Sequence, residues 1–111
     1  MSTFAPMPDP PYHAVIFSSQ LGAETAGYHE MAELLADLAS KQPGYIGAES
    51  LRDSRGYGIT VSYWRDAQAV LGWKQISTHL MAQKLGKARW YDHYTLRVAQ
   101  VERHYEGPEG R

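Results

Sequence analysis

The chain has 111 residues, a length that suits one domain, and its 43% hydrophobic and 21% charged residues are typical of a folded globular protein. A formal net charge of -1 excludes the basic surface that nucleic acids and anionic membranes attract. The absence of cysteine excludes disulfides, thiolate metal sites and a cysteine nucleophile. No apolar run approaches the roughly 18 residues of a membrane-spanning helix. The cysteine-free composition fits a reducing cytoplasm, so a cytoplasmic protein is expected.

Residues 1–11 are rich in proline and lack the basic and apolar regions of a signal peptide. This composition predicts an extended, poorly ordered arm, and the alternative is an arm that wraps a partner subunit. Residues 12–104 are expected to form a single domain, and residues 105–111 a flexible tail.

The domain opens with a strand and a helix. The β-prone run from Tyr12 to Ser18 carries apolar residues on both faces, which predicts a central strand. A helix is expected to begin at Glu24 or Thr25 and to stop at Pro43-Gly44. The apolar positions of this helix recur at three- and four-residue steps, at Tyr28, Met31, Leu34, Leu35, Leu38 and Ala39.

Three further strands are predicted. Residues 45–51 and 57–64 are strands that the polar turn 52–56 joins into an antiparallel hairpin. The last strand is expected to run from Trp90 to Arg103.

Two short helices are predicted between the third and fourth strands. Asp66 is placed to cap a helix that begins at Ala67, because its carboxylate can accept the free amide hydrogens of the first turn. Ser77 or Thr78 would then start a second helix, His79 to Leu85, and Gly86 would end it.

The expected order is therefore β-α-β-β-α-α-β. This order is that of the ferredoxin-like split β-α-β fold, an α+β fold with a four-stranded antiparallel sheet and helices on one face. Apolar residues on both faces of several strands indicate that the second face is also covered. A second copy of the same sheet is the simplest cover, so a homodimer is expected.

The segment from Gly58 to Tyr94 concentrates large aromatic side chains, including Trp64, Trp73 and Trp90. Such rings in a small domain indicate the wall of a pocket or an interface. The segment and its neighbours carry several short motifs: Gly44-Tyr45, Ser50-Leu51-Arg52-Asp53, Gly58-Ile59-Thr60-Val61-Ser62-Tyr63-Trp64, Trp73-Lys74, His79, Ala82-Gln83, Trp90-Tyr91, Tyr94, Arg97-Val98 and Val101-Glu102-Arg103.

With these motifs the chain resembles the antibiotic biosynthesis monooxygenase family from about Ala14 to Arg103. The resemblance implies a dimeric α+β barrel with a pocket between each sheet and its helices. Some members oxygenate phenolic or quinol substrates with molecular oxygen and no metal or flavin, and others bind and degrade haem. In the haem-degrading type the iron-ligating histidine would fall near Gln83, which is not an axial ligand, unless His79 one helical turn earlier replaces it.

Trp73 and His79 are the candidate catalytic residues. The indole of Trp73 can wall an aromatic substrate and donate to its oxygen, or it can simply belong to the core. His79 at the start of a short helix would be kept neutral by the helix dipole and could accept a proton from a phenol. The alternative for His79 is a half-exposed capping residue.

The candidate substrate-binding residues are Tyr63, Trp64, Trp90 and Tyr94, for each of which packing is the alternative role. Strand alternation would put Trp90, Asp92 and Tyr94 on one face, and Arg89, Tyr91 and His93 on the other. The sequence has no metal-ligand spacing and no glycine-rich phosphate loop, so no metal or nucleotide cofactor is expected.

Three functions follow from these observations. The first is a dimeric, cofactor-independent monooxygenase that oxidises a small aromatic or quinol, with His79 assisting deprotonation of the substrate. The second is a haem-binding or haem-degrading protein. The third is a dimer that binds a small ligand without turnover.

Overall fold

The computed structural model describes residues 4–85 and 90–108. Four strands and two helices follow one another along the chain: β1 (Tyr12–Leu21), α1 (Tyr28–Ser40), β2 (Tyr45–Arg52), β3 (Tyr57–Trp64), α2 (Ala67–Leu85) and β4 (Tyr91–Val101). No helix in these ranges is long and apolar enough to cross a membrane.

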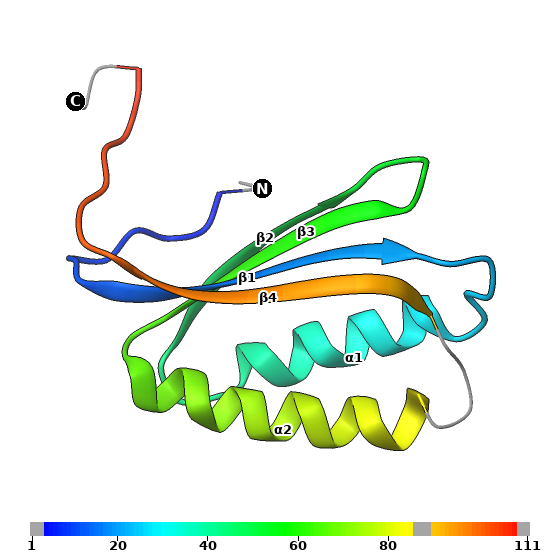
Figure 1. The fold of residues 1–111 in the computed structure, drawn as a ribbon. Coiled ribbons are helices and arrows are strands. Elements are labelled where there is room, and N and C mark those ends of the chain that lie inside the picture. Colours follow the sequence, from blue (N-terminus) through cyan, green and yellow to red (C-terminus); the bar gives the residue numbers. More distant parts are fainter. Residues whose placement is uncertain (1–3, 86–89, 109–111) are drawn as a thin grey trace.

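The four strands form one antiparallel sheet in the order β2-β3-β1-β4. Both helices lie on the same face of this sheet (Figure 1). The predicted ferredoxin-like α+β fold is therefore confirmed, with β1 as a central strand as expected. We call the two sides of the sheet the helix-facing side and the bare side.

Helix α1 begins later than expected, at Tyr28 rather than at Glu24 or Thr25. Gly27 precedes it in the left-handed conformation, with φ of 83°, and no side chain caps the first turn. The other end of α1 stops close to the expected site. Gly44 also has φ of 83°, and a Cβ there would lie 2.6 Å from the Cβ of Ala69, so glycine is needed where the chain turns into β2.

The two short helices predicted after β3 are one continuous helix, α2. The predicted cap is present, since the Asp66 carboxylate accepts a hydrogen bond from the Ala69 amide at 2.9 Å. The second predicted start is wrong. Ser77 donates its hydroxyl to the Lys74 carbonyl inside the helix instead of capping a new one, and the expected end at Gly86 lies outside the described residues.

The last strand begins at Tyr91 and ends at Val101, so the expected bounds of Trp90 and Arg103 were too wide. The pairing of β1 with β4 shifts register between Gln20 and Leu21. Because of this shift, the expected alternation is wrong at this end of β4. The rings of Tyr91 and Tyr94 lie on one side of the sheet, with centroids 6.1 Å apart.

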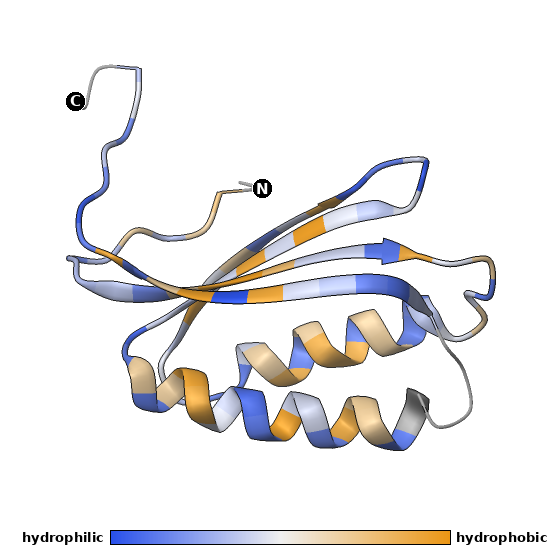
Figure 2. Cartoon of the chain, in the orientation of Figure 1, coloured by the Kyte–Doolittle hydropathy of each residue, from blue (hydrophilic) through white to orange (hydrophobic). Residues whose placement is uncertain are grey.

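The core lies between the sheet and the helices, where Val15, Ala39, Trp64 and Val70 are buried together. α1 packs against β2, and α2 packs against β1 and β3. Figure 2 shows the matching pattern, with hydrophobic and hydrophilic residues alternating along the strands and hydrophobic positions recurring along both helices. β4 lies at the edge of the sheet, beside β1.

The bare side of the sheet carries the N-terminal arm (Figure 1). The Ala5 amide donates to a Glu49 carboxylate oxygen at 2.9 Å, and Pro6 lies against Gly47 of β2. Beyond the arm, this side exposes Leu51, Tyr57 and Ile59, with Leu51 82% accessible. The arm thus covers one part of the bare side and leaves an apolar part uncovered.

Candidate functional site

The aromatic residues on the helix-facing side form two clusters. The Trp64 cluster consists of Tyr45, Trp64 and Trp73. Trp64 is completely buried, stacks on Trp73 at 5.8 Å between ring centroids, and meets Tyr45 edge-on at 5.4 Å. Its indole N–H donates to the Ser62 hydroxyl at 2.9 Å. The complete burial of Trp64 and the hydrogen bond of its indole N–H are features of a core.

The Arg52 cluster consists of Ser19, Tyr28, Arg52 and Tyr91, and it lies at the other end of the helix-facing side. The Arg52 Nη2 donates to the Ser19 hydroxyl at 2.7 Å and to the Tyr28 hydroxyl at 3.0 Å. The Nη1 donates to the Ser19 carbonyl at 3.2 Å and to the Gly56 carbonyl at 2.6 Å. The guanidinium carbon also lies 5.3 Å from the centroid of the Tyr28 ring, within range of a cation–π interaction.

Backbone geometry explains why the guanidinium can lie there. Arg52 is the last residue of β2 and pairs with Gly58 of β3, which in turn pairs with Ser19 of β1. A Cβ on Gly58 would lie 2.7 Å from the guanidinium carbon of Arg52. Gly58 therefore leaves the space through which the Arg52 side chain crosses β3 to reach Ser19.

Tyr28 and Tyr91 bring two phenols to the guanidinium. Tyr28 is the first residue of α1 and its ring meets that of Tyr91 edge-on at 5.9 Å. Burial raises the pKa of Tyr91 strongly, and the charge of Tyr28 and a hydrogen bond with it raise it further, while the Arg52 charge acts in the opposite direction. The Tyr91 phenol is therefore protonated at neutral pH.

A shell of aromatic rings surrounds the Arg52 cluster. Phe17 lies 5.4 Å from Tyr91 and 5.5 Å from Tyr94, measured between ring centroids. Trp90 is buried, packs edge-on against Tyr28 at 6.1 Å, and donates its indole N–H to the Ala26 carbonyl at 2.8 Å. These rings reduce the access of water to the phenols and the guanidinium.

The Arg52 cluster has no negatively charged partner in the part of the chain that the structure describes. The ion pair found there joins Lys41 and Asp37 on the surface of α1, 3.0 Å apart. All four acceptors of the Arg52 hydrogen bonds are neutral groups. A half-buried cation without a counter-ion is expensive unless an anion joins it, so this end of the molecule is suited to bind one.

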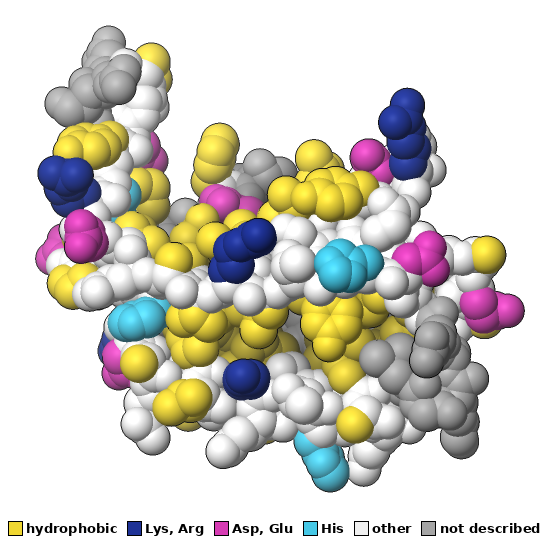
Figure 3. Space-filling view, viewed as in Figure 1, with side chains coloured by type: hydrophobic (Ala, Val, Ile, Leu, Met, Phe, Trp, Pro, Cys, Tyr) yellow, Lys and Arg dark blue, Asp and Glu magenta, His cyan; other side chains and the backbone are white. Residues whose placement is uncertain are grey.

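An apolar recess leads to this cluster. Three residues of β4 lie opposite residues of β1 that face the helices, and directly paired residues point to the same side of a sheet. These β4 residues are Tyr94, Leu96 and Val98, opposite Ser19, Phe17 and Val15. They are nevertheless 57%, 44% and 54% accessible. Figure 3 shows hydrophobic side chains gathered in the recess between β4 and the helix layer below it. We call this surface, formed by Tyr94, Leu96 and Val98, the β4 groove.

His79 lies apart from the groove and from both clusters. It is in the middle of α2, nine residues after the buried Val70, which turns it about 180° away around the helix. It is exposed, and its ring contacts Gln83 at 3.3 Å. The helix-start environment expected for its imidazole is therefore absent, because the helix starts at Ala67.

Tyr63 lies on the bare side, since neighbouring residues of a strand point to opposite faces and Trp64 faces the helices. Its hydroxyl donates to Glu49 at 3.1 Å. Burial, that hydrogen bond and the Glu49 charge raise the pKa of Tyr63. Tyr12 lies beside it at 6.0 Å between ring centroids, and the Tyr12 hydroxyl is 2.7 Å from the His104 Nδ1.

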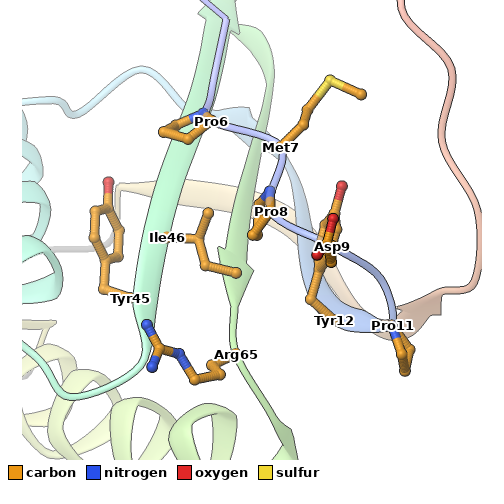
Figure 4. A pocket seen from close by; sticks show the side chains of 9 residues that line it. All are labelled: Pro6, Met7, Pro8, Asp9, Pro11, Tyr12, Tyr45, Ile46 and Arg65. Carbon is orange, nitrogen blue, oxygen red and sulfur yellow. The ribbon is translucent and has the colours of Figure 1, made fainter.

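The arm encloses two hollows on the bare side. One of about 190 Å³ lies between the arm, Tyr12, Glu49 and Tyr63. The other, of about 700 Å³, is walled mainly by arm residues with Tyr45, Ile46 and Arg65 (Figure 4). In these hollows Glu49 and Tyr12 already have partners, and the arm residues around the larger one are exposed. The Arg52 cluster is thus the more specific chemical site.

Of the site residues predicted from the sequence, the structure stacks Trp64 on Trp73. It connects Trp90 to Tyr94 through a series of ring contacts that passes by way of Tyr28 and Tyr91. It separates Tyr63 and His79 from these groups. Sequence reasoning missed the roles of Arg52, which lies in the predicted polar turn 52–56, and of Gly58, which lies in the predicted strand after it. Within residues 4–85 and 90–108, no group of three histidine, cysteine, aspartate or glutamate side chains could hold a metal ion.

Comparison with known proteins agrees with this fold. The model of the antibiotic biosynthesis monooxygenase family matches residues 14–85. The uncharacterized protein YqjZ of Bacillus subtilis strain 168 is 45% identical over 103 residues, which cover 93% of this chain and 90% of that protein.

Two solved structures share the fold at low sequence identity. SnoaB, a cofactor-independent oxygenase from Streptomyces nogalater, gives a TM-score of 0.61 at 16% identity and covers 90% of this chain and 100% of its own. A MhuD variant with two manganese protoporphyrin IX bound per active site gives a TM-score of 0.61 at 19% identity. That match covers 86% of this chain and 99% of the MhuD chain. The family match and the 45% identity to YqjZ show that this chain belongs to the antibiotic biosynthesis monooxygenase family.

Proposed function

We propose that this protein is an oxygenase that oxidises a small aromatic or quinol substrate with molecular oxygen in the β4 groove, without metal, haem or flavin. The observation that carries the proposal is the line of exposed apolar residues, Tyr94, Leu96 and Val98, on the side of the sheet that faces the helices. An aromatic ring bound along this line would be removed from water. The cofactor-independent oxygenase SnoaB shares the fold.

The chemistry needs no external reductant. When a phenol is oxidised to a quinone, one atom of O₂ enters the product and the other leaves as water, and the substrate supplies all the electrons. The ionised substrate is the form rich enough in electrons to reduce O₂, so the site must favour that form in a dry environment. A cytoplasmic location, expected from the cysteine-free sequence, is part of this proposal.

The residue roles in this proposal differ in part from those expected from the sequence. Tyr94 would line the groove. Trp90 would support the end of the groove at the Arg52 cluster, because its ring contacts Tyr28. Trp64 and Trp73 would stabilise the floor rather than touch the substrate, because Trp64 is completely buried. Proton transfer through His79 has no support from its position on the outer side of α2.

Haem is not proposed, because the residues present do not fit histidine-ligated haem. His79 is the histidine on α2, and it lies on the exposed side of that helix, in contact with Gln83. An axial ligand must point into the pocket that holds the macrocycle. Titration with haem tests this directly, and a saturable Soret band that shifts in His79→Ala would overturn it.

The proposal includes a homodimer formed through the bare side of the sheet. The exposed residues Leu51, Tyr57 and Ile59 form an apolar surface there that a second sheet could cover. Light scattering should give a dimer, and Ile59→Glu should shift it towards monomer. A wild-type protein that stays monomeric up to millimolar concentration would contradict the dimer.

The proposed activity is tested by oxygen uptake with a panel of small quinols and phenols. We expect saturable uptake with at least one of them, together with one quinone formed per O₂. Leu96→Trp should fill the groove and lower kcat/KM at least tenfold. The matched control is Leu34→Trp on α1, because Leu34 is 39% and Leu96 44% accessible, and it should leave uptake unchanged.

Two outcomes would contradict the oxygenase. Saturable binding of these compounds without any oxygen uptake would make the protein a ligand-binding dimer. Equal loss of uptake in Leu96→Trp and Leu34→Trp, with equal loss of melting temperature, would remove the groove as the site.

A further inference from the structure

We propose that the Arg52 cluster is an oxyanion site, which binds the ionised oxygen of a phenol or enol whose ring lies in the β4 groove. This inference rests on the proposed function for the groove, and it names the substrate class: an aromatic compound with an acidic hydroxyl. Arg52 is a positioning residue, and the Tyr28–Tyr91 pair touches the ligand.

The first step of the argument is the balance of donors and acceptors. The Arg52 guanidinium donates to the Tyr28 hydroxyl, and the Tyr28 ring meets the Tyr91 ring edge-on. Each phenol carries one O–H proton, and at most one of the two protons can join one phenol to the other. The Tyr28 oxygen already accepts from Arg52, so at least one of the two phenolic O–H groups remains to donate to a ligand. The ligand group at this end must therefore accept a hydrogen bond.

The second step is charge. The groups that face the two phenols are Arg52 from β2, Ser19 from β1 and Tyr94 from β4, while His29 contacts the Tyr28 ring from α1. Asp92 of β4 is exposed and lies over Gly22. Since no carboxylate pairs with Arg52 among the described residues, the positive charge acts on whatever accepts the hydrogen bond. An anion is therefore preferred over a neutral acceptor.

The third step is continuity between the polar end and the apolar groove. Tyr91 contacts both Phe17 and Tyr94, and Leu96 and Val98 follow on the same side of β4. A single planar ligand can therefore place its ring against Tyr94 and its oxygen at the phenol pair. Such a site would lower the pKa of a bound phenol, because a cation and a hydrogen-bond donor both favour the charged form.

The experiment uses 4-nitrophenol, which absorbs visible light only when it is ionised, and the full-length protein. Titrating the bound probe with acid should show its pKa lowered by at least one unit, which means that the phenolate binds at least tenfold more tightly than the phenol. Arg52→Met should abolish this preference. The matched control Arg55→Met removes the same charge from the exposed turn of the same hairpin and should keep it.

Two more variants keep the test informative if Arg52→Met fails to fold. Tyr28→Phe keeps the guanidinium but removes the hydroxyl that it binds, and should cut the preference at least threefold. Tyr91→Phe should do the same. Equal binding of both ionisation forms by the wild type, or a full preference in Tyr28→Phe and Tyr91→Phe together, would overturn the oxyanion site.

The outcome separates this inference from the proposed function. Preference for the phenolate without oxygen uptake would leave the oxyanion site standing and remove the oxygenase. Oxygen uptake that is unchanged in a folded Arg52→Met would leave the oxygenase standing and remove the oxyanion site.

Discussion

The Trp64 cluster and the Arg52 cluster lie on the same side of one sheet and are both aromatic, but they differ in what their polar atoms do. In the Trp64 cluster the indole N–H of Trp64 donates to the Ser62 hydroxyl, and the Trp64 ring is completely buried. In the Arg52 cluster a guanidinium binds only neutral acceptors, and the rings of two phenols lie edge-on beside it with an O–H left to donate. The comparison teaches that an unpaired charge with a free donor marks a binding site better than a concentration of tryptophan does.

The largest expected effect is on the Trp64 cluster. Trp64→Ala should lower the free energy of unfolding by about 3–5 kcal/mol, because it removes a fully buried ring and leaves a cavity beside Trp73 and Tyr45. Chemical denaturation measures this loss. Leu51→Ala, at a side chain 82% accessible, should change stability by less than about 0.5 kcal/mol. Similar losses in both variants would show that Trp64 does not organise the core.

The next effect tests the Arg52 cluster without removing the arginine. Gly58→Ala would bring a methyl group within 2.7 Å of the guanidinium carbon, so the Arg52 side chain must move away from Ser19 and Tyr28. Because the clashing atoms are the far end of a flexible side chain, the cost comes from the displaced hydrogen bonds to Ser19 and Tyr28 and is about 1 kcal/mol. Denaturation together with the 4-nitrophenol titration should show both a stability loss and a weaker preference for phenolate. Gly72→Ala on α2, where a Cβ meets nothing within 4 Å, is the control and should show neither.

A smaller effect follows from the raised pKa of Tyr91. Because burial and Tyr28 hold its folded pKa above the ordinary value of 10.0, the folded state keeps the proton longer than the unfolded chain does. The stability due to the neutral phenol is therefore fully present below about pH 10 and is lost as pH rises further. Melting temperatures measured from pH 8 to 11 should fall less steeply in Tyr91→Phe than in wild type. Parallel curves would show that Tyr91 does not titrate with folding.

The smallest effect is expected at His79. Its position on the outer side of α2 predicts that His79→Ala changes stability by less than about 0.5 kcal/mol and leaves oxygen uptake unchanged. The sequence alone favoured the opposite result for activity, a large loss of turnover with little loss of stability. Kinetics and melting of this one variant decide between the two, and a selective loss of turnover would restore His79 as the base.

The prediction of the fold depended on local patterns that the tertiary structure did not change. β3 runs from Tyr57 to Trp64 as predicted, since a β-prone run follows a short polar turn. The errors fall where local signals were ambiguous. Ser77 and Thr78 can either cap a new helix or continue an existing one, and packing of α2 against the sheet favours continuation.

The site was harder to predict, because it depends on distances across strands. Ser19, Tyr28, Arg52 and Tyr91 come from three strands and a helix, and no spacing in the sequence links them. A single register shift between Gln20 and Leu21 turns Tyr91 to the same side as Tyr94, against the simple alternation of the strand.

The sequence by itself determined the α+β order and the aromatic character of the segment from Gly58 to Tyr94, because hydrophobic period and turn residues act over short distances. The family was indicated separately, by the resemblance of short motifs. Only the tertiary structure decided which rings are core and which line a groove. It also decided that Arg52 crosses β3 over Gly58, because a charged side chain takes its partners from residues up to 33 positions away in the chain.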